Sequence, residues 1–220
     1  MVSYPLVNDT GFLTDLKDTL LIFYQKNNVV YHIPYFNPTT INGKLISEEV
    51  KHHYFIFHKA DKYGYFYDEI NDSSTGKKLQ VDSFLFNNAF AIKVKNDSLV
   101  LLESLTDKKN NELLEKYRPN TWYNEFTYDS TYFYYSGNLK KIDYSFSQQS
   151  DSIKNMKLYK IRFLYNAYHS NTANINVPKR AFLFKVEPFQ INMDMENNSL
   201  VKKIKAAIKR SKKQAEHQLH

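Results

Sequence analysis

Histidine is the residue type in this sequence best suited to bind a metal or carry a proton, and three of the seven histidines lie close together at His52, His53 and His58. In an extended strand His52 and His58 share a face but stand about 20 Å apart, and His53 faces the opposite side. These three side chains do not reach one ion, although His32 could meet one of them across a sheet. The run has no HxH or HExxH spacing. We therefore predict no metal site and no cofactor.

Other catalytic patterns are incomplete. The chain has no cysteine, which excludes a thiol nucleophile and thiolate metal ligands. Gly76 and Lys77 resemble the end of a phosphate-binding loop, but Asn71 stands where that loop needs its first glycine and Lys78 where it needs Ser or Thr. No serine lies in a GxSxG turn, and neighbouring carboxylates on a strand point to opposite faces. These absences favour a protein without catalytic activity.

One enzymatic alternative stays open, because a catalytic triad assembles from residues that are distant in sequence. His32, His53 and Asp61 supply two imidazoles and a carboxylate, the groups that a hydrolase needs. We take them as the residues of a candidate hydrolase-type site. The test is whether the three side chains converge in the fold.

Positive charge is concentrated at the C-terminus. The net charge is +7, and residues 199–220 hold seven Lys or Arg residues and one Glu, so the rest of the chain is nearly neutral. A basic segment of this kind can meet nucleic acid, an anionic surface or an acidic protein. Arginine reads bases better than lysine does, and one arginine among seven cations argues against sequence-specific readout. The candidate binding residues are Lys202, Lys203, Lys205, Lys209, Arg210, Lys212 and Lys213.

Aromatic side chains form a second candidate surface. The chain has 18 Tyr and 16 Phe but a single Trp. Two runs of aromatic residues, 65–67 and 132–135, send alternate side chains to opposite faces when they are strands. Outward tyrosines make contact surfaces for proteins or sugars, and the scarcity of Trp favours a protein partner. The residues predicted to face outward are Tyr65, Tyr67, Tyr132 and Tyr134.

Period-two hydrophobic patterns predict about nine short strands that would position these residues. Residues 19–24 and 29–35 read as a hairpin, and Pro34 places the second strand at an edge or at its end. Residues 52–58 and 63–67 read as a second hairpin, and 90–94 and 98–102 as a third. Further strands are expected at 122–128, 131–135, 140–147, 158–168 and 181–186. In the strand at 158–168, Tyr159, Ile161, Phe163 and Tyr165 are expected on the buried face.

Helical spacing of apolar residues predicts three helices. Residues 79–87 and 107–117 each carry a short apolar stripe, the second with Leu113, Leu114 and Tyr117. Residues 199–218 carry Leu200, Ile204 and Ile208 at a spacing of four, with lysines around them. The simplest interpretation of this last stripe is a helix that docks on a sheet and keeps its lysines in solvent.

The pattern as a whole predicts a β-dominated α+β fold, either of mostly antiparallel sheet or sheets or of a sandwich or open barrel, with two or three short helices and a C-terminal basic amphipathic helix. Strand–helix alternation, which a parallel α/β fold requires, is absent. We expect a single β-rich domain over 1–196 and a basic helical appendage over 197–220.

The function predicted from these observations is a non-catalytic β-rich binding or structural domain that acts through protein–protein contacts. A nucleic-acid or anionic-surface binder that uses the C-terminal helix is the alternative beside the hydrolase. The sequence has no run of 18 apolar residues, so no membrane span is predicted, and residues 1–18 do not resemble a signal peptide. The lack of cysteine fits an exported or cell-envelope protein slightly better than a cytoplasmic one.

Overall fold

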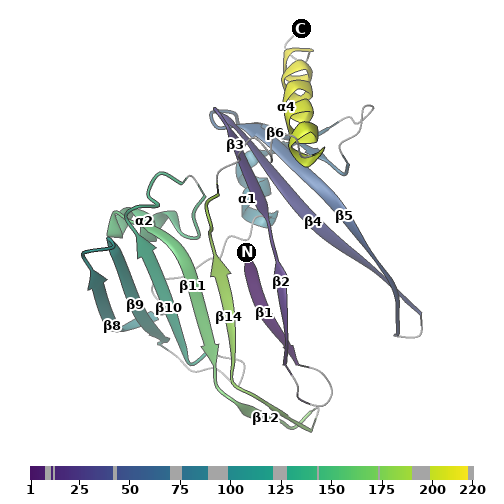
Figure 1. Ribbon diagram of the computed structural model, residues 1–220. Coiled ribbons are helices and arrows are strands. Elements are labelled where there is room, and N and C mark those ends of the chain that lie inside the picture. The colour runs from purple at the N-terminus through teal and green to yellow at the C-terminus, as the bar shows by residue number, and fades with distance from the viewer. Residues whose placement is uncertain are drawn as a thin grey trace. The chain divides into compact units, whose positions relative to one another are not determined.

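The computed structural model describes residues 1–7, 11, 13–41, 44–69, 76–88, 99–120, 128–142, 144–172, 174–189 and 199–217. Strands predominate, all strand pairs are antiparallel and the sheets are open, which confirms the predicted β-dominated antiparallel fold (Figure 1). The chain divides by its contacts into two compact units. Unit 1 comprises Met1–Asp18 and Phe90–Pro188, and unit 2 comprises Thr19–Ala89 and Phe189–His220.

Unit 2 is built on a five-stranded sheet in the order β3-β4-β5-β6-β7. The predicted hairpins at 19–35 and 52–67 are confirmed, and helix α1 lies at the predicted place. Strand β4 extends well beyond β3, and Pro34 lies in the part of β4 that has only β5 beside it, where its missing N–H costs no ladder bond. The elements are β3 (Leu21–Gln25), β4 (Asn28–Ile41), β5 (Lys44–His58), β6 (Tyr63–Tyr67), β7 (Lys77–Gln80), α1 (Val81–Asn88) and α4 (Ser199–His217).

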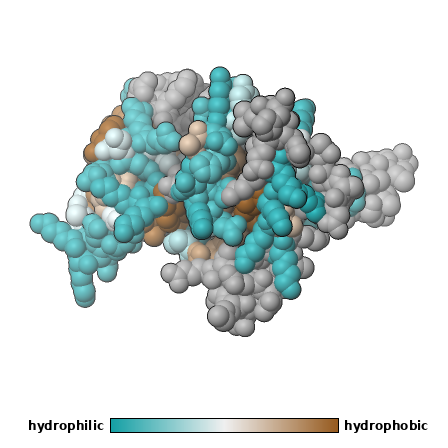
Figure 2. Space-filling view, turned by 90° about the horizontal axis from the view of Figure 1, so that it is seen from above, coloured by the Kyte–Doolittle hydropathy of each residue, from teal (hydrophilic) through white to brown (hydrophobic). Residues whose placement is uncertain are grey.

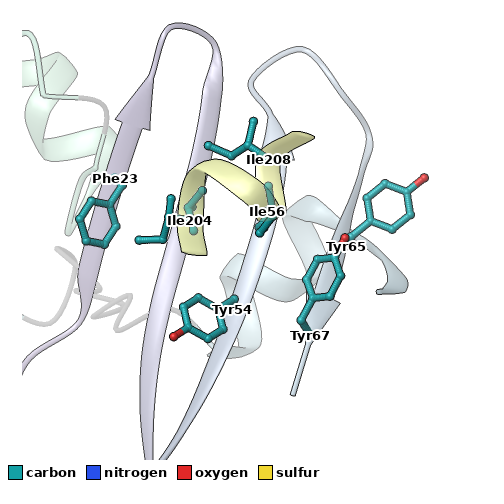
Figure 3. Packing of buried hydrophobic residues seen from close by; sticks show 9 residues of the cluster. Phe23, Tyr54, Ile56, Tyr65, Tyr67, Ile204 and Ile208 are labelled. Atoms are coloured by element: carbon teal, nitrogen blue, oxygen red, sulfur yellow. The ribbon is translucent and has the colours of Figure 1, made fainter. Parts of the chain in front are cut away.

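Both faces of this sheet are covered. On one face Ile204, Ala207 and Ile208 of helix α4 pack on buried strand residues that include Ile56 (Figure 3). On the other face Phe84 of α1 stacks on buried aromatic strand residues. Alternation along the strands gives each face its own set of apolar side chains. The C-terminal helix is therefore part of the core of unit 2. The buried cluster between α4 and the sheet consists of Phe23, Val30, Tyr54, Ile56, Tyr65, Tyr67, Ile204, Ala207 and Ile208.

Unit 1 is built on a seven-stranded sheet in the order β2-β1-β14-β11-β10-β9-β8. One face carries the core, and helix α2 contacts β11. A separate pair of short strands, β12 and β13, follows β11 in the chain. The elements are β1 (Val2–Val7), β2 (Leu13–Asp18), β8 (Leu99–Asp107), β9 (Glu112–Pro119), β10 (Ser130–Ser136), α2 (Gln148–Lys154), β11 (Lys157–Tyr165), β12 (Tyr168–Ser170), β13 (Ile175–Val177) and β14 (Arg180–Lys185).

Two predicted elements of unit 1 are wrong. Residues 107–117, expected as a helix, form the end of β8, a turn and the first part of β9. Strand β9 pairs with β8 and β10, so Leu113 faces the core and Leu114 the opposite side. The strand expected at 140–147 is irregular in its described residues, and the chain there leads into helix α2, which was not predicted. Residues 90–94 of the third hairpin and 122–127 of a further strand lie outside the described residues.

The buried face of β11 was predicted only in part. A β-bulge lies where Tyr134 pairs with Lys160 but Tyr135 pairs with Leu158, so Tyr159 is the extra residue. The bulge turns Leu158, expected outside, onto the core face, where it is fully buried with Ile161. Because side chains alternate only within an uninterrupted ladder, the sequence pattern shifts face at Tyr159.

The two compact units are defined by their contacts, whereas a domain is defined by cooperative unfolding. The sequence predicts one domain over 1–196, and that expectation stays a prediction. The helix over residues 199–217 packs on the sheet of unit 2, since Ile204, Ala207 and Ile208 are each at most 5% exposed.

Candidate contact surface

The predicted meeting of His32 with another histidine across the sheet is confirmed. His32 Nε2 lies 3.0 Å from Nδ1 of His52, a hydrogen bond between strands β4 and β5. The His32 ring also stacks on Tyr54, with ring centroids 4.9 Å apart. Register explains the contact, because His32 opposes Tyr54 and His52 lies two residues away on the same face.

Burial decides the charge of His32. His32 is 8% exposed, and its Nδ1 has no hydrogen-bond partner. Burial, followed by the neighbouring His52, lowers the pKa of His32 from 6.5 to about 4. The ring is therefore neutral at pH 7. Within the described ranges no third histidine or carboxylate joins a metal-binding group.

The candidate hydrolase site is wrong as a constellation. His53 opposes Ile33 on the sheet face that α1 covers, whereas His32 lies on the face that α4 covers. His53 Nδ1 lies 3.3 Å from an Asp68 carboxylate oxygen, an ion-pair distance without hydrogen-bond geometry. Asp61 lies in the turn after β5, 3.8 Å from His58. The sheet separates His32 from His53, and Asp61 lies in a turn beside His58, so the three groups do not converge on one substrate atom.

Two of the four predicted surface tyrosines are buried. Tyr65 is 7% and Tyr67 2% exposed, because helix α4 packs on their face of the sheet. Burial, with Tyr65 nearby, raises the pKa of Tyr67 to about 12. Alternation was predicted correctly for this strand, but the covering helix lies far along the chain. Tyr65 and Tyr67 therefore belong to the core and not to a contact surface.

The other two predicted tyrosines, Tyr132 and Tyr134, lie on the face of the seven-stranded sheet opposite its core. Their neighbours Phe133 and Tyr135 are fully buried, and both tyrosines are half-buried. Register places them in two rows across the sheet, which we call the outer face. One row is Leu105, Leu114, Tyr134, Lys160 and Lys185, and the other is Glu103, Lys116, Tyr132, Arg162 and Leu183.

Cations cover the rings of the outer face. Lys160 lies 4.1 Å from the ring centroid of Tyr134, and Lys116 lies 5.5 Å from that of Tyr132. Desolvation, together with Lys185 and Arg162, lowers the pKa of Lys160. Lys185 opposes Lys160 in the ladder, and its own ammonium group is paired with the Glu187 carboxylate.

Strand β8 lies at the edge of the sheet, and its exposed leucines form what we call the leucine edge. Leu101, Leu102 and Leu105 are 49%, 50% and 53% exposed, and among the described strands β8 pairs only with β9. Leu105 lies on the outer face, whereas Leu101 opposes the core residue Tyr117 and lies on the core side. Leu102 is the extra residue of a β-bulge, and Glu103 follows it. Bulges and charges are devices that oppose pairing with another strand. In the view of Figure 2 the described surface is mostly hydrophilic, with smaller hydrophobic areas between.

A buried polar network, which sequence reasoning missed, ties helix α2 to the core face of unit 1. Glu115 is 2% exposed and accepts hydrogen bonds from Lys154 Nζ at 2.5 Å and Tyr117 Oη at 2.6 Å. Burial and the bond to Glu115 raise the pKa of Tyr117 far above its usual value. Asp151 accepts from Lys157 Nζ and from the Leu158 N–H, each at 2.7 Å. Every member has a partner within the network, so its role is structural.

The basic residues of the C-terminal segment divide by position on α4. Lys202, Lys205, Lys209 and Lys213 are exposed, and Arg210 is half-buried near Tyr67. The side chains of Lys203 and Lys212 lie outside what the structure describes. In the described part of the chain, no helix has the length and apolar character needed to cross a membrane.

Comparison of the sequence with models of protein families finds no match, and comparison with curated proteins finds none either. The functional argument therefore rests on the surfaces described above.

Proposed function

We propose that the protein is a non-catalytic binding domain that contacts another protein through the outer face and the leucine edge of the seven-stranded sheet. The observation that carries the proposal is the row in which Leu105, Leu114 and Tyr134 follow one another on the face opposite the core. Tyrosine is enriched at protein interfaces, because its ring is apolar and its hydroxyl bonds at the rim.

The side chains of the outer face indicate which chemical groups the partner's surface carries. Apolar side chains at the β8 end fit an apolar patch, and Lys160 and Arg162 of β11 fit carboxylates. The bulge at Leu102 and the charge of Glu103 oppose the addition of a strand to the β8 edge. The contact is therefore made by side chains on the face and not by a shared backbone ladder.

Differential capture followed by titration tests this proposal. The wild type, the double variant Tyr134→Ala/Leu105→Ser and the control Ile153→Ser are immobilised and exposed to extracts of the source organism. Ile153 is a matched control because it is an exposed apolar residue, 66% accessible, on helix α2. Circular dichroism verifies that each variant is folded.

A protein retained by the wild type and the control but lost by the double variant is purified and titrated against all three. We expect the double variant to bind at least about tenfold more weakly, since two interface side chains are each worth about 1 kcal/mol or more. Equal affinity of the double variant and the wild type for every captured protein overturns the proposal.

A further inference from the structure

Helix α4 presents two opposite faces, and the buried one is already occupied. Ile204, Ala207 and Ile208 lie in the core of unit 2 (Figure 3). The exposed lysines recur three or four residues apart, so they form one line on the side away from the sheet. At about 1.5 Å per residue this line is about 16 Å long. We call it the lysine stripe, and its members are Lys202, Lys205, Lys209 and Lys213.

An exposed aromatic ring lies on the same face of the sheet as the helix. Tyr63 is 44% exposed and precedes Tyr65 and Tyr67 by two and four positions on β6, so all three share the face that α4 covers. Two lysines lie over its ring, Lys62 at 5.8 Å and Lys78 at 5.1 Å from the centroid. The face therefore combines a line of cations with an accessible, cation-flanked ring.

We propose that this face of unit 2 binds single-stranded nucleic acid, with phosphates along the lysine stripe and a base stacked on Tyr63. Evenly repeated cations match a polyanion, and a ring beside them supplies the stacking platform that single-strand binding uses. All four stripe residues are lysine, which grips phosphates as a point charge and does not read base edges in bidentate fashion. Binding is therefore tolerant of sequence.

A membrane surface fits this face less well. An interfacial helix binds lipid by burying its apolar side in the bilayer, and in α4 the Ile204, Ala207 and Ile208 side is buried against the sheet. Only the charged side remains, and it lacks an apolar anchor. This surface is independent of the outer face of unit 1, so the two proposals succeed or fail separately.

Fluorescence anisotropy with an oligothymidylate of about 20 nucleotides tests the inference across salt from about 50 to 200 mM. For the wild type we expect affinity to fall about fiftyfold over this range, as four phosphate contacts on a single strand imply. For the quadruple variant K202Q/K205Q/K209Q/K213Q we expect the slope of log affinity against log salt concentration to be shallower than that of the wild type by about three.

Matched variants separate this site from net charge and from aromatic surface in general. K108Q/K109Q/K140Q/K141Q removes the same number of exposed charges from turns of unit 1 and should keep the wild-type slope. Tyr63→Ala should weaken single-strand binding about fivefold or more. Tyr24→Ala should have no effect, because Tyr24 is 40% exposed and also lies under a lysine, Lys59, but on the opposite face of the sheet.

Three results overturn the inference. The first is absence of oligothymidylate binding by the full chain at about 50 mM salt. The second is an equal loss in both quadruple variants, which would indicate net charge alone. The third is binding to phosphatidylserine vesicles that depends on the lysine stripe while the oligonucleotide is ignored. A duplex of the same length should bind without dependence on Tyr63, because its bases are already stacked.

Discussion

Helices α2 and α4 each close one face of a sheet, but they do so with opposite chemistry. Helix α4 inserts Ile204, Ala207 and Ile208 among aromatic strand residues of unit 2. Helix α2 is attached to unit 1 through ionised groups, chiefly Lys154 on Glu115. The apolar contact is stabilised in proportion to its area and tolerates small errors of position. The ionic contact depends on each group being present, because an unpaired buried charge is costly.

The sequence predicts the apolar helix α4 but not the polar helix α2. The stripe Leu200, Ile204 and Ile208 predicts a docked helix, since apolar spacing reports burial directly. Helix α2, by contrast, presents Ile153 to solvent at 66% exposure and uses polar residues inside. Its seven residues lie between the N-cap Ser147, whose side chain accepts from the Ser150 N–H, and the C-cap Asn155, which has the left-handed conformation. Short capped helices with polar contacts give no hydrophobic period to detect.

The largest expected effect is on the ionic side of the comparison. Lys154→Met leaves the Glu115 carboxylate buried, with the Tyr117 hydroxyl as its remaining partner. We expect the free energy of unfolding to fall by about 3 kcal/mol, the low end of the range for breaking a buried pair, because Lys154 itself is partly exposed. Urea unfolding followed by circular dichroism measures the change.

The control for this variant is Lys140→Met, which removes an exposed lysine from a turn of unit 1 and should cost under about 0.5 kcal/mol. The double variant Glu115→Gln/Lys154→Met should recover part of the loss, since no charge is then buried. Equal effects of Lys154→Met and Lys140→Met would contradict the assignment of Lys154 to a buried pair.

The next effect is on the apolar side. Ile204→Ala removes a side chain that is 3% exposed in the core under α4, and we expect a loss of about 2 to 4 kcal/mol. Alanine is the better helix former, so the loss measures packing and not helix propensity. Ile153→Ala, on an exposed site of α2, is the matched control and should change stability little. A loss below about 1 kcal/mol for Ile204→Ala would show that α4 is not held by its apolar face.

The same two variants test the domain prediction. Ile204 lies outside residues 1–196 but packs on the sheet of unit 2. If residues 1–196 unfold as one domain, as the sequence predicts, Lys154→Met and Ile204→Ala therefore lower a single shared transition. Two transitions, each moved by one variant, would instead make the two compact units separate domains. Calorimetry on the full chain distinguishes these outcomes.

Local patterns predicted most of unit 2 and less of unit 1 for a physical reason. In β9, Leu113 and Leu114 are adjacent apolar residues that serve opposite faces of the sheet, so their spacing with Tyr117 imitates a helix. In β11, one inserted residue reverses the face of Leu158. Both cases are decided by neighbouring strands, and the register of those strands is not written in the local period.

The prediction of the candidate surfaces was also limited by what a local pattern contains. Alternation correctly separated Tyr132 and Tyr134 from the core, and both side chains are half-buried. The same reasoning failed for Tyr65 and Tyr67, because a helix over a hundred residues later in the chain covers them. Sequence period states which side chains share a face. It does not state which faces a distant element covers.

The smallest expected effect concerns His32, which lies on the sheet face that helix α4 covers. The pKa of His32 is lowered to about 4 from 6.5, so folding favours its neutral form. Its contribution to stability is complete above pH 6.5 and is lost as pH falls from there towards 4. We expect the free energy of unfolding to drop by about 1 to 3 kcal/mol over this window from His32 alone, with part of the full shift discounted for solvent screening.

His32→Phe, which keeps a ring against Tyr54, should remove this acid-dependent loss and leave stability near neutral pH within about 1 kcal/mol of the wild type. Urea titrations at intervals between pH 7 and 4 provide the measurement. His169→Gln is the control, because His169 is an exposed histidine of unit 1 and its replacement should keep the wild-type slope. An unchanged slope in His32→Phe would mean that His32 is not buried as a neutral ring, and that the α4 side of unit 2 admits charge where the apolar contact is expected to exclude it.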